Sequence, residues 1–385
     1  LITTLLEMCF ADNHLGASID LSKVSEDLMK VLFAENIGIV FQAKNDAVLE
    51  KTLQDNGVEF FKIGQVENSD ILNVSGFKFQ VSSYRDIWYK TSFLLDQKQS
   101  KNGKALERFT NYKNQPLQFT FPKHFTGIID SVVGKKRPIA AVIREKGSNS
   151  EREMANAMYL AGFDVKDVHM TDLISGRETL EDVQFIGAVG GFSNSDVLGS
   201  AKGWAGAFKY NEKANSALKN FFKREDTLSV GICNGCQLFV ELGLINPDHE
   251  QKPRMLHNDS HKHESNFTSV TIQENKSVML STLAGATLGV WISHGEGKFQ
   301  LPYEENQYNI VGKYGYEGYP ANPNGSAYNT AMMCDNTGRH LVMMPHIERS
   351  IFQWNWAYYP EGRKDEVSPW LEAFVNARKW IENLK

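Results

Sequence analysis

The stretch from Leu228 to Val240 constrains the fold of this chain more than any other. It reads Leu-Ser-Val-Gly-Ile-Cys-Asn-Gly-Cys-Gln-Leu-Phe-Val, so a short apolar run leads into Gly-x-Cys-x-Gly and then into helical spacing. This pattern is typical of a nucleophile elbow, a tight strand-to-helix turn with the nucleophile at its tip. Side chains at Gly231 and Gly235 would collide with their neighbours in such a turn. We therefore expect Cys233 between a strand end and a helix start.

The position of Cys233 predicts a nucleophile, because a helix N-terminus stabilises a thiolate through its dipole and its free N–H groups. The alternative is a buried structural cysteine, which is our interpretation of Cys236 on the helix behind the turn. The Cys-x-x-Cys spacing also allows a thioredoxin-like or zinc site, but Gly235 and the lack of a second Cys pair argue against both. Four cysteines without framework spacing favour reduced thiols and a cytoplasmic location.

The length of 385 residues allows two or three domains. A net charge of −5 gives no basic field that would point to nucleic acid, and no apolar stretch is long enough for a membrane span. Residues 1–95 read as a smaller α+β domain, with strands expected over 16–21, 37–42, 58–66 and 71–81. Residues 96–136 lose periodicity and predict a linker. The apolar helical pattern already present at residues 1–8 indicates part of a longer chain.

Residues 137–385 alternate between apolar strands and helices, which predicts an α/β fold with a doubly wound, mostly parallel sheet. Strands are expected at 139–143, 165–169, 185–189 and 228–232, and the later third is richer in β-structure. Sites in such sheets lie at the carboxyl ends of the strands. Gly190-Gly191, Cys233 and His346 each follow a predicted strand, so we expect them at one edge. The closing helix over 369–384 carries an aromatic stripe that we interpret as core.

The residues at this edge fit nucleophilic acyl transfer. A thiol needs a base, and the base needs an orienting partner, for which His346 and Glu348 are the candidates. The developing oxyanion needs donors, which the backbone N–H groups of Gly191 and Asn234 could supply. The sequence therefore predicts a Cys233–His346–Glu348 triad with an oxyanion hole. The alternative for His346 alone is a surface histidine in a proline turn.

Four motifs occur in an order that resembles the class I (triad) glutamine amidotransferases, and within them the glutaminase region of the large single-chain phosphoribosylformylglycinamidine synthases. They are Gly-Gly-Phe-Ser (190–193), Gly-Ile-Cys-Asn-Gly-Cys-Gln (231–237), Ser-His-Gly-Glu-Gly-Lys-Phe (293–299) and Met-Pro-His-Ile-Glu-Arg (344–349). Residues 5–11 and 35–42 resemble the C-terminal part of an aminoimidazole-ribonucleotide-synthetase-like domain.

The resemblance implies that Cys233 attacks the side-chain amide of glutamine and releases ammonia with the help of His346. The ammonia would serve the ATP- and magnesium-dependent conversion of formylglycinamide ribonucleotide to formylglycinamidine ribonucleotide in de novo purine biosynthesis. This chain would then be a fragment without most of the synthetase site, needing the rest of that chain as partner and holding no cofactor or metal of its own. The resemblance also implies a glutamine pocket formed by Gln237, Asn258, Ser260 and His294.

The sequence departs from the family pattern at three positions. Ile347 stands where the family commonly has proline, and His263 and Asn266 replace phenylalanine and arginine. With His257, His261 and Asp259, His263 also suggests a zinc site, although the alternating spacing fits a solvated loop better. Two other classes stay open: a thiol peptidase or deglycase on the same fold, and a non-catalytic assembly subunit. Glutaminase assays distinguish both from an amidotransferase.

Overall fold

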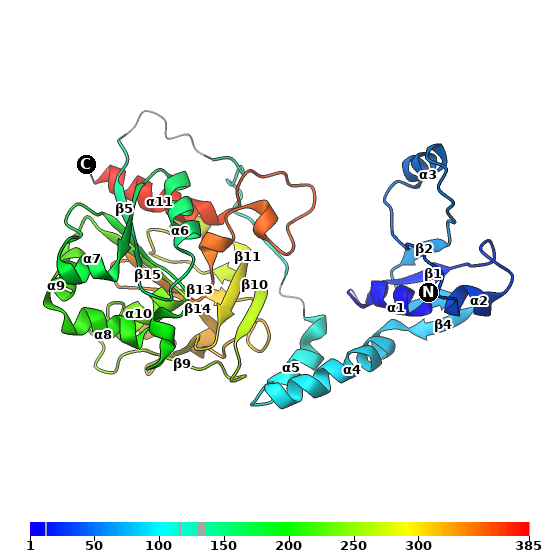
Figure 1. Cartoon of the computed structure of the whole chain (residues 1–385), viewed down its shortest axis with the longest axis horizontal. Helices are drawn as coiled ribbons and strands as arrows, with labels where there is room; N and C mark the ends of the chain where they lie inside the picture. Colours follow the sequence, from blue (N-terminus) through cyan, green and yellow to red (C-terminus); the bar gives the residue numbers. More distant parts are fainter. Residues whose placement is uncertain (12–13, 115–116, 130–135, 385) are drawn as a thin grey trace. The chain divides into compact units, whose positions relative to one another are not determined.

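The computed structural model describes residues 1–11, 14–114, 117–129 and 136–384, which form two compact units, Leu1–Lys98 and Gln99–Lys385 (Figure 1). Part of the predicted linker, residues 115–116 and 130–135, lies outside this description. In the described ranges, no helix combines the length and apolar character that crossing a bilayer requires.

The first unit is a four-stranded sheet with strand order β2-β1-β3-β4 and flanking helices. Its small core includes Leu5 of α1 and the fully buried Leu21 and Leu72. Asn45 caps the N-terminus of α3, because its side chain accepts a hydrogen bond from Val48 N–H. The elements are α1 (Ile2–Phe10), β1 (Gly16–Ile19), α2 (Leu28–Phe33), α3 (Asp46–Asp55), β2 (Gly64–Glu67), β3 (Ile71–Val74), β4 (Phe77–Gln80) and α4 (Val81–Gln99).

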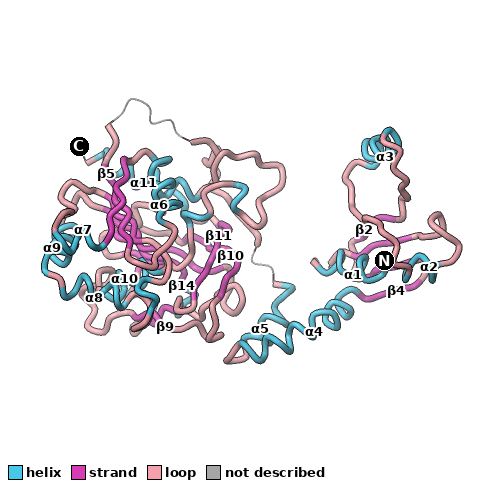
Figure 2. The backbone as a smooth tube through the Cα atoms, in the orientation of Figure 1, coloured by secondary structure: helices cyan, strands magenta, loops and turns pink. Residues whose placement is uncertain are grey.

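Three strand predictions for this unit differ from the structure. Residues 37–42 run as a loop between α2 and α3 (Figure 2), with Ile37 and Ile39 exposed. An apolar alternation becomes a strand only where a neighbour pairs with it, and no described strand does so here. The run over 71–81 is not one strand but the β3–β4 hairpin, which turns at Gly76 with φ +95°. Within residues 58–66, only the part from Gly64 onward forms a strand, β2, which pairs with β1.

The second unit is built on a nine-stranded sheet in the order β11-β10-β13-β14-β15-β8-β7-β5-β6. Neighbouring strands from β15 to β6 are parallel, which confirms the α/β fold. Neighbouring strands from β11 to β15 are antiparallel, so the later third of the chain extends the parallel sheet with antiparallel strands. The strands are β5 (Ile139–Arg144), β6 (Asp164–His169), β7 (Phe185–Ala188), β8 (Leu228–Ile232), β10 (Glu264–Ile272), β11 (Thr287–His294), β13 (Asn309–Tyr314), β14 (Thr330–Cys334) and β15 (His340–Met343), with β9 (Arg254–Leu256) and β12 (Lys298–Gln300) forming a separate pair.

Helices cover both faces of the parallel strands. α6 and α11 pack together, while α10 packs on α8, α8 on α9 and α9 on α7 (Figure 1). The aromatic stripe of α11 is core as predicted: Trp370 and Phe374 are fully buried, and Trp370 Nε1 donates to Gly289 O at 2.7 Å. The helices are α5 (Lys104–Thr110), α6 (Glu151–Ala161), α7 (Met170–Ser175), α8 (Lys202–Tyr210), α9 (Glu212–Lys223), α10 (Asn234–Glu241) and α11 (Trp370–Asn383). Helix α5 lies within the segment for which the sequence predicted a linker.

Candidate active site

Cys233 occupies the turn between β8 and α10, with backbone angles φ +52° and ψ −107°. Gly231 and Gly235 are needed for the predicted reason, which is that side chains at these positions would collide with neighbouring atoms. A Cβ at Gly231 would lie 2.6 Å from Gly235 O, and one at Gly235 would lie 2.0 Å from Ala188 O. Cys233 N–H donates to Met343 O at 2.8 Å, which fixes the turn to the end of β15. The nucleophile elbow predicted from the sequence is therefore present, and its cysteine is only 5% exposed.

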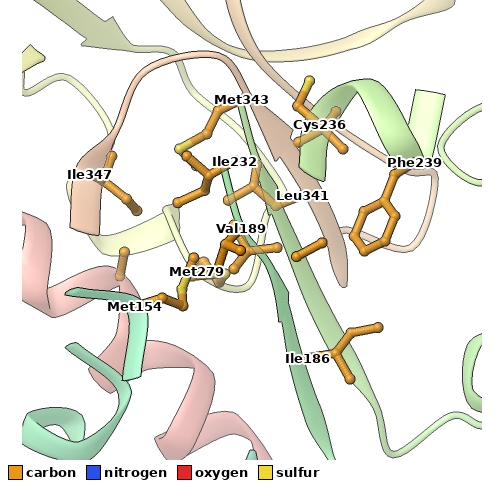
Figure 3. Close-up of a cluster of buried hydrophobic side chains, with 14 of the residues drawn as sticks. Met154, Ile186, Val189, Ile232, Cys236, Phe239, Met279, Leu341, Met343 and Ile347 are labelled. Atoms are coloured by element: carbon orange, nitrogen blue, oxygen red, sulfur yellow. The ribbon is translucent and has the colours of Figure 1, made fainter. Parts of the chain in front are cut away.

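Cys236 lies behind the turn as expected and is completely buried. It packs among apolar side chains that include Phe239 of the same helix (Figure 3). Burial raises the pKa of the Cys236 thiol well above its ordinary value. A thiol without solvent contact and with a raised pKa is a poor nucleophile, so the structure separates the roles of the two cysteines.

His346 and Glu348 form a buried hydrogen-bonded pair next to the elbow. The distance from His346 Nδ1 to Glu348 Oε1 is 2.6 Å, and the two residues are 1% and 3% exposed. His346 N–H also donates to Trp291 O at 2.8 Å, so the loop after β15 is fixed to β11. The spacing of two residues lets the short helical turn Ile347–Arg349 bring the carboxylate back to the ring.

The electrostatics of this pair favour a charged imidazole. Burial opposes the charge on His346, but the Glu348 carboxylate and the Cys233 side chain, which is within hydrogen-bonding reach, outweigh it and raise the pKa of His346. Burial likewise opposes ionisation of Glu348, yet the adjacent imidazolium holds the pKa of this carboxyl below its usual value. The arrangement thus keeps a proton on the ring, where it can be donated to a leaving group.

Gly190 brings the thiol and the imidazole together. A Cβ at this position would lie 2.7 Å from His346 Cε1 and 3.4 Å from Cys233 Cβ, so both side chains pack directly against the glycine. The ends of β7, β8 and β15 thus meet at one edge of the sheet, as the sequence predicted. Gly190 also has a role that was not predicted from the sequence. Its lack of a side chain leaves room for the imidazole of His346.

The two predicted oxyanion donors come from the loop after β7 and from the start of α10. Gly191 has φ +116° and lies against Ser148, while Asn234 is the first residue of α10. Within the described ranges, the backbone N–H groups of Gly191 and Asn234 have no hydrogen-bond acceptor. Free N–H groups are expected at the first turn of a helix, and they are what an oxyanion requires.

The predicted pocket residues form two hydrogen-bond networks. Asn234 Oδ1 accepts from Ser193 N–H at 3.1 Å, and its Nδ2 donates to Gln237 Oε1 at 2.9 Å. Gln237 Nε2 in turn donates to Glu296 O at 2.7 Å. This network joins the loop after β7, the start of α10 and the loop after β11. Gln237 therefore has its amide engaged within the protein.

Asn258 and His294 form the second network. Asn258 Nδ2 donates to the carbonyl oxygens of His294 and Lys262, and Oδ1 accepts from Gly297 N–H at 3.1 Å and lies 3.2 Å from His294 Nδ1. Burial beside the imidazoles of His346 and His263 lowers the pKa of His294 to about 3, so the ring is neutral. His294 Nε2 is buried without a partner among the described residues, which leaves an acceptor free.

Ser260 is turned toward a carboxylate. It is fully buried, and its Oγ donates to Glu264 Oε1 at 2.5 Å. Of the family departures, His263 Nε2 lies 3.0 Å from Ser293 Oγ, and Asn266 Oδ1 accepts from Phe267 N–H at 2.8 Å. Ser293, which opens the third motif, is a residue that sequence reasoning missed. Its carbonyl oxygen accepts a hydrogen bond from Cys233 Sγ at 3.5 Å.

The histidines considered for zinc do not gather around one point. Asp259 pairs with Lys298 at 2.6 Å, and His257 lies 3.8 Å from Glu296. Over the part of the chain that the structure describes, no group of three or more His, Cys, Asp or Glu side chains is arranged to hold a metal ion.

A cavity of about 560 Å³ lies beside the His346–Glu348 pair. His346, Glu348 and Ser293 line it together with Arg152, Arg349 and other residues of α6, β11 and the loop after β15. Glu348 Oε2 is buried without a protein partner among the described residues.

Comparisons with known proteins show the family to which this chain belongs. Residues 137–381 match the sequence model of the CobB/CobQ-like glutamine amidotransferase domain. The chain belongs to this family of glutamine amidotransferases. The solved structure of PurLQS from Thermotoga maritima is similar to this amidotransferase, with a TM-score of 0.50 and 25% identity over 65% of this chain and 100% of that chain.

Two relatives match this amidotransferase over nearly its whole length. The probable phosphoribosylformylglycinamidine synthase, chloroplastic/mitochondrial, of Arabidopsis thaliana is 39% identical over 423 residues, which cover 100% of this chain and 29% of that protein. The phosphoribosylformylglycinamidine synthase of Homo sapiens is 37% identical over 422 residues, which cover 99% of this chain and 31% of that protein. The chain thus spans less than a third of the length of these relatives.

Proposed function

We propose that this chain hydrolyses glutamine through the Cys233–His346–Glu348 triad and supplies the ammonia for phosphoribosylformylglycinamidine synthesis. The observation that carries the proposal is the buried His346–Glu348 pair, held against the thiol of a nucleophile elbow. Burial costs both charges their hydration, and mutual pairing offsets that cost. An ion pair in this position is suited to moving a proton during acyl transfer.

The proposed reaction begins with attack of Cys233 Sγ on the side-chain amide carbon of glutamine. The carbonyl oxygen becomes an oxyanion, and the N–H groups of Gly191 and Asn234 stabilise it. His346 gives its proton to the amide nitrogen, the C–N bond breaks, and ammonia leaves a γ-glutamyl thioester. His346 then takes a proton from water, the hydroxide attacks the thioester carbon, and the C–S bond breaks. Glutamate is released, and Cys233 is again a thiolate beside the protonated His346.

The glutamine pocket in this proposal combines direct contacts with positioning through the loops. His294 Nε2 offers a free buried acceptor for a donor group of the substrate. Gln237, Asn258 and Ser260 have polar atoms engaged by neighbouring protein groups. We therefore assign these three residues to holding the pocket loops.

The fate of the ammonia is part of the proposal. Relatives named phosphoribosylformylglycinamidine synthase are about three times as long as this chain. We propose that the remaining length supplies the site where ATP and magnesium activate formylglycinamide ribonucleotide for amination. The predicted cytoplasmic location stays a prediction, and the Arabidopsis relative is named as chloroplastic/mitochondrial.

The test is glutamate release from glutamine, followed with this chain alone and with the chain joined to the upstream part of a relative. We expect glutamate from glutamine in both and ATP-dependent formation of formylglycinamidine ribonucleotide only in the second. Transfer of label from amide-¹⁵N glutamine into the product checks the coupling. A peptide or a glyoxal used as substrate in place of glutamine would instead support the peptidase or deglycase alternative.

A further inference from the structure

Helix α5 and the residues just before it are hydrogen-bonded to the loop that carries the predicted pocket residues. Lys101 N–H donates to Ser260 O at 2.9 Å, and Asn102 Nδ2 donates to Asp259 O at 2.8 Å. We name residues 257–263 the pocket loop. Its backbone is thus held by a segment for which the sequence predicted only a linker.

A buried carboxylate is the centre of this attachment. Glu264 is 4% exposed and is the first residue of β10, directly after the pocket loop. Its Oε2 lies 3.3 Å from Arg108 Nη2, and both of its oxygens accept from Tyr319 Oη at 3.0–3.1 Å. Arg108 also contacts the Tyr319 hydroxyl and lies 4.8 Å from the centre of the tyrosine ring.

The same carboxylate is connected to the active site on its other side. Glu264 Oε1 accepts from Ser260 Oγ at 2.5 Å, and Glu264 pairs with His294 across the β10–β11 ladder. His294 also contacts Asn258 of the pocket loop, and the carbonyl oxygen of the preceding residue, Ser293, accepts a hydrogen bond from the Cys233 thiol. A displacement of Glu264 would therefore move both the pocket loop and the strand end beside the nucleophile.

We propose that Arg108 and Tyr319 are positioning residues for glutamine, acting through Glu264 on the pocket loop. The inference rests on the proposed glutaminase function. It adds positioning residues that lie outside the edge of the sheet where Cys233 and His346 meet. A carboxylate taken out of water needs its donors to stay in place. When one donor is lost, Glu264 turns toward the remaining donors and carries Ser260 with it.

The experiment uses the chain with Arg108→Ala and Tyr319→Phe, with Arg108→Lys as the conservative variant. Leu106→Ala, an exposed position on the same helix, is the matched control. We expect the KM for glutamine to rise about tenfold in the first two variants with kcat changed much less, because coupling through packed networks typically has this size. Arg108→Lys should recover part of the loss, and Leu106→Ala should keep the parent KM.

Two thiol reagents separate positioning from general loss of structure. Iodoacetamide needs only the reactive Cys233, whereas a glutamine-derived chloroketone also needs the pocket. The proposal predicts slower labelling by the chloroketone alone. Equal slowing of both reagents, or a parent KM in Arg108→Ala and Tyr319→Phe, would overturn it. If the unsubstituted chain released no glutamate and ignored the chloroketone, the proposed function would fail instead. If Arg108→Ala does not fold, Tyr319→Phe still decides the question.

Discussion

Replacing Cys233 with alanine is expected to lower glutamine hydrolysis by about 10⁵-fold or more, the size of effect seen when an acyl-transfer nucleophile is removed. The reason is that Cys236 and Cys334, the other described thiols of the second unit, are completely buried and cannot take over the attack. The measurement is steady-state glutamate release at saturating glutamine.

Cys236→Ala is the matched control, because it removes a thiol three residues away without touching the elbow. We expect it to retain most of the activity and to lose some stability through the small cavity left in the core. Activity that survives Cys233→Ala, or that disappears equally in Cys236→Ala, would remove the argument that the elbow selects the nucleophile.

Replacing Glu348 with glutamine is expected to reduce kcat/KM by roughly 10²–10⁴-fold while leaving the fold intact. The amide can still bond to the ring but no longer supplies the negative charge that raises the pKa of His346. The pKa of His346 should therefore fall, by roughly 1–3 pH units for the loss of an opposite charge at this distance. Because the proposed role of the imidazolium is to give its proton to the leaving amide nitrogen, the alkaline limb of the pH–rate profile should move to lower pH.

The measurement for Glu348 is kcat/KM for glutamate release between pH 5 and about 10. Glu153→Gln is the control, because it removes the same charge from a half-exposed side chain that lines the neighbouring cavity. His346→Ala should be more severe than Glu348→Gln, since it removes the proton carrier. An unchanged rate and profile in Glu348→Gln would reduce the triad to a Cys233–His346 dyad.

The parts of the site that the sequence predicted are those governed by local rules. The elbow follows from glycines two residues on either side of Cys233, and the His346–Glu348 contact follows from a spacing that one helical turn closes. The common edge follows from parallel strands, whose carboxyl ends lie together. Each of these inferences needs only a few neighbouring residues.

The parts that could not be predicted depend on partners far away in the chain. Residues 37–42 carry a strand-like alternation but have no described neighbour to pair with, so they run as a loop. The contact of Arg108 with Glu264 joins positions 156 residues apart, and hydrophobic periodicity in the sequence does not predict a contact of this kind. Likewise, Asn258 and Ser260 match motif positions, yet only the folded chain shows that their polar atoms bind other protein groups.

Trapping the covalent intermediate tests the central claim most directly. The chain is mixed with glutamine, quenched in acid within one turnover, digested and analysed by mass spectrometry. The account predicts a γ-glutamyl group on the peptide that contains Cys233, released by hydroxylamine as a thioester should be, and absent in Cys233→Ala. Glutamate release without any adduct on Cys233, or an adduct on another residue, would contradict it.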